Sequence, residues 1–172
     1  MKTLLIILVF ITLSYKDKSE NFSKHLNPQI NSTIIENKFP QKIGFVNDFE
    51  KILTHSEKIE LEKIIKNYEK KTKNEIVIIT VNSIKPYNDP YKFSDDIFNN
   101  WKVGKKNGKG LSILVSKSLR KIAVSVTPKA QKYFTDEIIN NTIQPILIPE
   151  LKKGKYFDGL KKTLEEITTN WK

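Results

Sequence analysis

Cysteine is absent from this 172-residue chain, and the absence removes several kinds of chemistry at once. Without a thiol there is no cysteine nucleophile, no thiolate metal site and no disulfide bond. A lipid-modified cysteine behind an export signal is excluded for the same reason. Stability therefore has to come from a hydrophobic core, for which a chain of this length has room.

Catalytic motifs are scarce as well. The chain has only two histidines, His25 and His55, and neither stands in a recognisable catalytic pattern. No P-loop, Ser-His-Asp arrangement or zinc-ligand spacing occurs in the sequence. Histidine catalysis is therefore not expected, and no motif supports binding to nucleic acid.

Only one long apolar run is present. It extends from Leu4 to Leu13, is broken only by Thr12, and follows a basic start at Met1 and Lys2. The run is too short to span a bilayer and predicts a signal peptide over residues 1–14. The polar residues 15–41 then predict a linker without regular structure. We expect an exported protein, located in the periplasm or outside the cell, either free or associated with a membrane.

Acidic residues are in the minority, with 19 against 30 lysines and arginines, and the formal net charge is +11. A basic surface favours anionic partners such as phosphate groups, membrane lipids or cell-wall polymers. Lysine, asparagine and isoleucine are abundant while alanine and arginine are rare, which is also the pattern of a general compositional bias. Charge alone therefore identifies no partner.

Hydrophobic periodicity predicts a chain of alternating helices and strands. Residues 54–57 have the spacing of a capping box and begin a helix that extends to about Thr72. Just before it, Asp48 is placed to cap a single helical turn. A third helix begins at Thr135 or Asp136, and its two prolines interrupt it because proline lacks the amide donor. The other expected elements are strand 75–81, helix 91–101, a glycine- and lysine-rich loop over 102–110, strands 111–115 and 121–126 joined by a hairpin, and a last helix from Tyr156.

A crossover through a helix makes the strands at 75–81 and 111–115 parallel, and the hairpin makes 121–126 antiparallel. In this last strand Ile122, Val124 and Val126 point one way, as in a half-covered strand. Helices on both faces of a small mixed sheet give a three-layer α/β/α sandwich. We therefore predict a single α/β domain over residues 42–172.

Several short motifs occur in a characteristic order. They are GFVNDFEKIL, NEIVIITV, WKVG, GKGLSILVS, RKIAVSV and FTDEIINNTIQPIL. Together they resemble the TPM domain over about residues 42–170. The family takes its name from a thylakoid-lumen protein, a photosystem II repair protein and a nematode receptor modulator. The resemblance implies an α/β/α sandwich that faces a lumen, a periplasm or the cell exterior. For some plant members it also implies acid-phosphatase activity and a divalent-metal site.

Seven positions match the family's motifs: Asp48, Trp101, Gly104, Gly110, Arg120, Lys121 and Asp136. The candidate site residues are Asp48, Gly104, Gly110 and Asp136 among these, together with Lys109 and Lys129. Two departures stand beside these matches. Lys109 occupies a position where the family has Asp or Asn, and residues 127–131 replace the family's G-x-G-x-E, with Lys129 adding a positive charge. A backbone cradle and one carboxylate are thereby lost.

The sequence leaves two readings of these residues open. If a metal is bound, Ca²⁺ or another divalent ion would lie on Asp48 and Asp136, although topology does not require the two to converge and each could instead cap backbone amides. Lys109 and Lys129 could bind an anion together with free amides of the glycine loop, or could be solvated.

The departures favour a non-catalytic binding or accessory module, without a cofactor, for an envelope or membrane protein or an anionic surface. The alternative is a metal-assisted acid phosphatase with a degenerate acidic site. A third reading is an accessory protein held by an uncleaved N-terminus, and oligomeric state stays open.

Overall fold

A capping box fixes the start of the longest helix in the computed structural model, which describes residues 39–171. Thr54 accepts a hydrogen bond from the Glu57 amide, and the Glu57 carboxylate accepts one from the Thr54 amide in return. The helix α2 (His55–Thr72) buries Leu61, Ile65 and Tyr68 on one face, as its periodicity predicts. The expected signal peptide at 1–14 and most of the expected linker lie outside the described residues.

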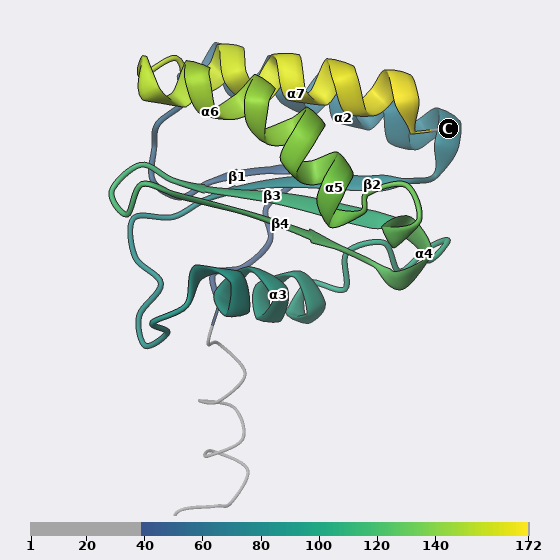
Figure 1. Ribbon diagram of the computed structural model, residues 1–172, viewed down its shortest axis with the longest axis horizontal. Helices are drawn as coiled ribbons and strands as arrows, with labels where there is room; N and C mark the ends of the chain where they lie inside the picture. The colour runs from purple at the N-terminus through teal and green to yellow at the C-terminus, as the bar shows by residue number, and fades with distance from the viewer. Residues whose placement is uncertain (1–38, 172) are drawn as a thin grey trace, which may run out of the picture. The chain divides into compact units, whose positions relative to one another are not determined.

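The elements form three layers, which confirms the predicted sandwich (Figure 1). The middle layer is a sheet of four strands in the order β1-β2-β3-β4. Helices α2, α6 and α7 cover one face of it and α3 the other. The bounds are β1 Val46–Asp48, β2 Glu75–Thr80, α3 Pro90–Asn100, β3 Gly110–Ser116, β4 Lys121–Val126, α4 Pro128–Gln131, α5 Asp136–Ile138, a π-helical turn Ile139–Ile143, α6 Gln144–Lys152 and α7 Tyr156–Asn170.

The sheet is mixed, with the expected directions. Strands β1, β2 and β3 are parallel to one another, and β4 is antiparallel to β3. All seven residues of β3 are buried, and so are five of the six in β2. Their apolar runs therefore lie at the centre of the sheet, covered on both faces. No helix of the described part of the chain is long and apolar enough to cross a membrane.

The predicted order of elements lacked two short elements, the helix α4 and the first strand, β1. Strand β1 has only three residues, and its central Asn47 is polar, so it carries no period-2 hydrophobic signal. The Asn47 side chain is nevertheless fully buried. Its oxygen accepts from the amides of Ile43 and Gly44, and its amide donates to the carbonyl oxygen of Gly44. This local turn makes a polar residue compatible with a strand.

The predicted interruption by prolines was also wrong. The backbone stays helical from Asp136 to Lys152, with Pro145 in the first turn of α6 and Pro149 inside it. The five-residue π-helical turn directly precedes α6. A π-helical turn is wider than an α-helical turn, so it relieves the clash between a proline ring and the preceding turn. Its hydrogen-bond pattern also does not require the amide that proline lacks.

Strand β4 is covered differently from the prediction. Ile122, Val124 and Val126 do share one face, and they pack against the main core as partly buried side chains. The opposite face carries the more deeply buried residues, because Ala123 is buried and Ser125 hydrogen-bonds to Ser94 of α3 at 2.8 Å. Both faces are therefore covered, and what is left open is the outer edge of the strand.

Candidate functional site

The candidate residues divide between two ends of the sheet. The hairpin end comprises the carboxyl ends of β1, β2 and β3 together with the hairpin at 117–120, and the glycine-loop end comprises residues 101–110 with the start of β3. Asp48 pairs with Thr80, which pairs with Val115, whereas Gly110 opens β3 opposite Glu75. Five strand residues at about 3.3 Å each separate the two ends by about 17 Å.

Gly104 and Gly110 pack against each other at the glycine-loop end. A Cβ on Gly104 would lie 2.5 Å from the amide nitrogen of Gly110, and a Cβ on Gly110 would lie 2.8 Å from Cα of Gly104. Both glycines are buried, and Gly104 also has a φ of +79°. Their lack of a side chain serves close packing of backbone on backbone and leaves no space there for a ligand.

The amides of the glycine loop are engaged within the protein. Gly104 donates to the carboxylate of Glu75 at 2.8 Å, and that carboxylate also pairs with Lys42. Lys109 donates to the Asn107 side chain at 2.8 Å. Further along, Gly108 donates to the Gly104 carbonyl at 2.8 Å and Gly110 donates to the Thr127 hydroxyl at 3.0 Å. An anion cradle of free amides is therefore not formed by these four groups.

The two candidate lysines of this end, Lys109 and Lys129, also have local partners. The Lys129 ammonium lies 3.5 Å from the Asn107 carbonyl oxygen, so the structure brings it to the loop that carries Lys109, as topology predicts. The Lys109 ammonium lies 5.2 Å from the ring centre of Tyr133, a cation–π contact. Asp136 belongs to the same end, because it follows Phe134, which packs on Trp171 at 4.9 Å. It is exposed in the first turn of α5, where a negative charge favours the helix.

Asp48 lies at the opposite end and caps a turn of backbone. Its two carboxylate oxygens accept from the amides of Ile52 at 3.1 Å and Leu53 at 3.0 Å, and from the hydroxyl of Thr80. Residues 49–53 bend without regular structure and do not form the single helical turn that was predicted, so that part of the prediction was wrong. The carboxylate is committed to holding the segment that follows β1.

Glu50 fastens the same segment to the hairpin. Its carboxylate accepts from the amides of Lys117 at 2.9 Å and Ser118 at 2.8 Å, and from the Ser118 hydroxyl at 2.6 Å. Sequence reasoning missed this contact because 67 residues separate the partners. Asp48 and Asp136 thus stand at opposite ends of the sheet. Within residues 39–171 no group of three or more histidine and acidic side chains could hold a metal ion.

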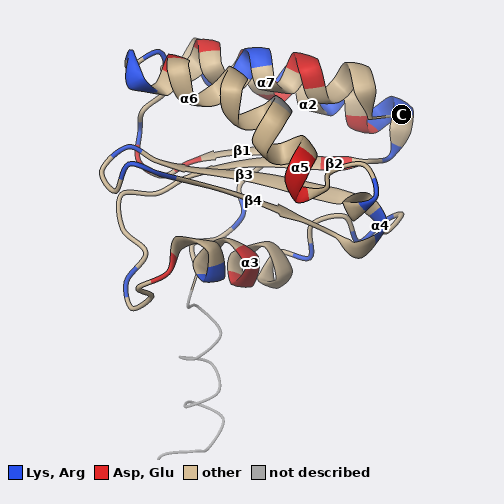
Figure 2. Ribbon diagram, viewed as in Figure 1, with Lys and Arg blue, Asp and Glu red and all other residues tan. Residues whose placement is uncertain are grey.

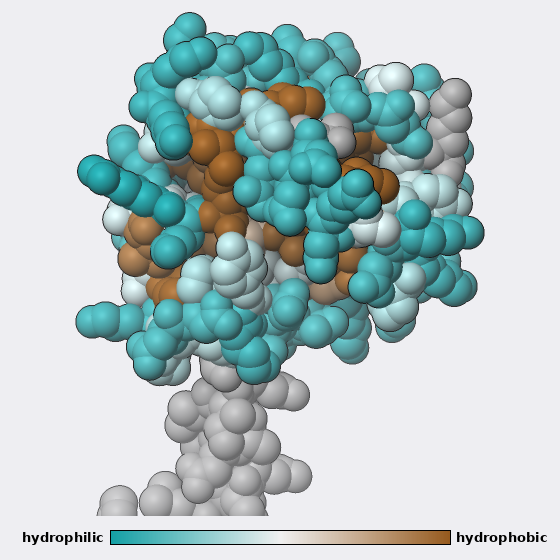
Figure 3. Space-filling model, viewed as in Figure 1, coloured by the Kyte–Doolittle hydropathy of each residue, from teal (hydrophilic) through white to brown (hydrophobic). Residues whose placement is uncertain are grey.

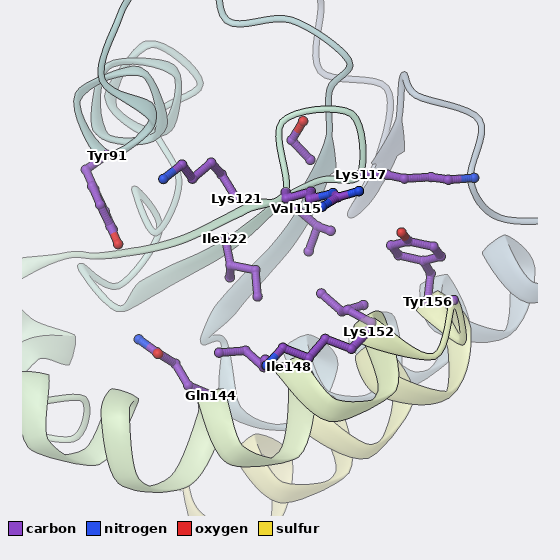
Figure 4. A pocket seen from close by; sticks show the side chains of 13 residues that line it. Tyr91, Val115, Lys117, Lys121, Ile122, Gln144, Ile148, Lys152 and Tyr156 are labelled. Carbon is purple, nitrogen blue, oxygen red and sulfur yellow. The ribbon is translucent and has the colours of Figure 1, made fainter.

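A groove of about 790 Å³ opens at the hairpin end, between the hairpin and the layer of α6 and α7. Its floor is apolar and includes Val115, Ile122, Ile148 and Leu151. In Figure 4, Ile122 projects from β4 and Gln144 and Ile148 from α6 toward a common space, with Tyr91 and Lys121 on the other side. The groove therefore lies across the outer edge of β4.

The rim of the groove is basic. Four cationic side chains line it, and no carboxylate does: Lys117, Arg120, Lys121 and Lys152. Figure 2 shows the hairpin that carries three of them in blue at the left of the sheet. Lys117 lies 5.8 Å from the ring centre of Tyr156, which also lines the groove. Such a site suits a ligand that is apolar in part and negatively charged in part.

The sequence contained a signal for this groove that was not used. Arg120 and Lys121 were matched to the family's motif but were not assigned to a site. A hairpin with three cations between Lys117 and Lys121 is visible in the sequence. What the sequence did not show is that α6 returns to the same end of the sheet and brings Lys152 beside them.

Comparison with solved structures shows the same fold in bacterial proteins. The N-terminal domain of a P. gingivalis protein matches with a TM-score of 0.65 and 18% identity, covering 78% of this chain and 85% of that chain. BA42 from Bizionia argentinensis matches at 0.62 and 21%, covering 71% and 83%. The N-terminal domain of a Corynebacterium glutamicum protein matches at 0.57 and 13%, covering 76% and 82%.

Among curated proteins, none matches the chain. The family model described as the TPM domain, labelled TPM phosphatase, matches residues 46–170, which include every strand and helix of the sandwich. The resemblance that the ordered motifs predicted is thereby confirmed. This chain belongs to the TPM domain family.

Proposed function

We propose that this chain is an exported TPM domain that binds an envelope protein or an anionic surface without catalysing a reaction on it. The observation that carries the proposal is the basic groove at the hairpin end. Four cations without a carboxylate among the lining residues create a local positive potential, and the apolar floor offers surface to bury. A binding site needs these two properties, and neither depends on a reactive group.

The commitment of Asp48 supports the non-catalytic part of the proposal. A carboxylate that accepts hydrogen bonds from Ile52, Leu53 and Thr80 has few lone pairs left for a metal ion. Asp136 stands at the other end of the sheet and cannot complete a shared ligand set with it. Gly104 and Gly110 pack against each other and leave no space for a ligand between them.

A matched pair of variants tests the proposal in one experiment. The full chain is immobilised and incubated with an envelope fraction, beside Lys117→Gln/Arg120→Gln/Lys121→Gln and beside the control Lys63→Gln/Lys66→Gln/Lys70→Gln. The control removes the same charge from exposed lysines of α2. We expect the wild type and the control to retain one specific protein or lipid class that the groove variant loses. Equal retention by all three chains would contradict the proposal.

The metal-assisted acid phosphatase stays the rival, favoured by the label of the matching family model. It requires divalent-cation-dependent hydrolysis of p-nitrophenyl phosphate by the purified chain, with Ca²⁺, Mg²⁺ and Mn²⁺ tested in turn. It also requires that Asp136→Asn abolishes this turnover. Turnover with that dependence would replace our proposal, and its absence with all three ions would leave the binding module.

A further inference from the structure

The outer edge of β4 carries unpaired backbone groups. β4 is the last strand in the sheet order, with β3 on one side only. The Thr127 amide donates to the Gly110 carbonyl at 3.0 Å, so the backbone groups of Thr127 point toward β3. Because direction alternates along an antiparallel strand, those of Ile122, Val124 and Val126 point outward. Among residues 39–171 no hydrogen bond engages these outward groups.

This edge lacks the features that usually protect an edge strand. Lys121 is its only charged residue and stands at the first position, and the remaining five read IAVSV. The pairing with β3 is one-to-one from Lys121 to Val126, without a bulge, and the strand contains no proline. Proteins commonly block exposed edges with charges, prolines or bulges, because an open edge pairs with other chains. β4 is therefore able to accept a further strand.

The groove provides room beside that edge. Tyr91 of α3 is 61% exposed and lies on one side of the edge, while Gln144 and Ile148 of α6 lie on the other (Figure 4). Figure 3 shows apolar surface in the hollow between the α6 layer and the sheet, flanked by hydrophilic side chains. A strand laid here could direct alternate side chains toward α3 and toward α6.

The positive charge around the edge of β4 favours a negatively charged ligand. Lys117, Arg120 and Lys121 stand at the start of β4, and no carboxylate lines the groove. Arg120 has a φ of +53°, a left-handed conformation that glycine adopts without strain.

We propose that β4 binds an acidic, extended peptide segment of the partner as a fifth strand. This inference rests on the proposed function and names the form of its ligand. Main-chain hydrogen bonds to Ile122 and Val124 would hold the segment, and its carboxylates would pair with the basic rim. A segment as long as β4 measures about 20 Å at 3.3 Å per residue. A bilayer is planar and cannot reach the concave floor, and a small anion would leave the apolar floor unused.

Three synthetic peptides test the geometry directly. The first, fluorescein-Glu-Val-Glu-Thr-Glu-Val, is acidic and β-branched; the second replaces glutamate with lysine; the third repeats the first with alternate amides N-methylated. Fluorescence anisotropy with the full chain should show saturable, salt-sensitive binding of the first peptide. The other two should bind at least about tenfold more weakly, because they lose charge pairing and ladder hydrogen bonds respectively.

Amide hydrogen exchange measured by NMR separates strand addition from simple charge attraction. The acidic peptide should slow exchange at Ile122 and Val124 by about tenfold or more, because their outward amides become hydrogen-bonded. Amides of α2 should be unaffected. If the peptide binds but does not slow amide exchange at Ile122 or Val124, the strand geometry is overturned.

Two variants locate the site. Lys117→Gln/Arg120→Gln/Lys121→Gln should weaken peptide binding by roughly tenfold, while Lys63→Gln/Lys66→Gln/Lys70→Gln should change it by less than about twofold. Val124→Pro should abolish binding with the fold kept, because proline is tolerated where an edge amide faces solvent. Near-UV circular dichroism verifies that fold. If Val124→Pro unfolds the chain, the charge variant and the exchange data still decide.

Other outcomes would overturn the proposal. Vesicles of phosphatidylglycerol and phosphatidylcholine that bind while the acidic peptide does not would assign the groove to a lipid surface. Equal binding of the N-methylated peptide, or full competition by inorganic phosphate, would leave only an anion site. A dimer in light scattering that Val124→Pro abolishes would assign the edge to a second copy. If the peptide experiments fail but the envelope experiment still shows selective retention, only the strand geometry is removed. Cation-dependent turnover of p-nitrophenyl phosphate would instead remove the proposed function itself.

Discussion

The glycine-loop end and the hairpin end of the sheet are both rich in lysine, but the fold engages these lysines differently. At the glycine-loop end Lys106 pairs with Glu69 at 2.8 Å, and Lys109 and Lys132 lie 5.2 Å and 5.0 Å from the ring centre of Tyr133. At the hairpin end four cations line a groove of about 790 Å³ that no carboxylate lines. Similar residue types thus make local contacts in one place and line a groove in the other.

The difference arises from the backbone. Two glycines allow the loop at 101–110 to close on itself, so several of its amides donate inward, and Lys106 and Lys109 contact neighbouring side chains. Glu50 fixes the hairpin through its backbone amides, and the side chains of Lys117 and Arg120 line the groove. Positive charge becomes available to a ligand only where the fold leaves space beside it.

The largest expected effect is at the glycine pair. Gly104→Ala should destabilise the chain by about 3 kcal/mol or more, because the new Cβ meets backbone at 2.5 Å. Gly154→Ala is the matched control, since its φ of +76° is similar but nothing lies within 4 Å of the added Cβ. It should cost only about 1 kcal/mol, the strain of the left-handed conformation. Urea unfolding measures both, and equal losses would show that the glycines are not packed as described.

A second prediction concerns the two aspartates. Asp48→Ala should cost about 2–3 kcal/mol, because two amides and a hydroxyl lose their acceptor. Asp136→Ala should change stability by less than about 0.5 kcal/mol, because the side chain is exposed. Thermal unfolding of both variants measures the contrast. A loss at Asp136 as large as at Asp48 would contradict the assignment of Asp48 as the structural residue.

The third prediction concerns Tyr68, which ties the chain terminus to the glycine-loop end. Its hydroxyl donates to the Trp171 carbonyl and accepts from Asn74, and Asn74 in turn accepts from Asn107 of the loop at 3.1 Å. Tyr68→Phe should cost about 1–2 kcal/mol at neutral pH. Denaturant unfolding at pH 7 measures this loss, and no loss would show that the network carries no stability.

The same tyrosine gives a dependence on pH. Burial raises the pKa of Tyr68 above its usual value of 10.0. The unfolded chain therefore loses this proton first, so the contribution is complete below pH 10 and falls as the pH rises above it. Tyr68→Phe should show a smaller loss of stability than the wild type as the pH rises above 10, because it lacks the group that titrates there. Parallel curves would contradict the effect of burial.

The smallest expected effect is at Arg120. Arg120→Gly should stabilise the chain by about 0.5 kcal/mol, because glycine relieves the left-handed strain and part of that gain is lost to unfolded-state entropy. It should at the same time weaken binding of the acidic peptide, which anisotropy measures. Unchanged or stronger binding of the acidic peptide by Arg120→Gly would remove Arg120 from the groove's function.

Much of the fold could be predicted from the sequence because its signals are local. The capping box at Thr54, the β-branched run in β2 and the hairpin before β4 each lie within a few residues and are confirmed. Strand β1 could not be predicted, because three residues carry no period and its pairing partner lies about thirty residues away. The continuity through Pro145 depended on a π-helical turn for which the sequence has no clear signal.

The candidate site was less predictable, because its residues come from distant segments. Asp48, Gly104, Gly110 and Asp136 were found from motifs, yet the structure uses Asp48 for backbone capping and the two glycines for mutual packing. Binding surfaces depend on what is left uncovered, which no local pattern records.

The sequence by itself determined the family, the order of most elements and the excess of positive charge, because these follow from local pattern and composition. Only the tertiary structure decided which charges face an open surface. Crossover connections and the return of α6 place Lys152 beside the hairpin, 35 residues away from Lys117 along the chain. The physical reason is that most polar groups find hydrogen-bond partners within the fold, whereas the outward backbone groups of β4 do not.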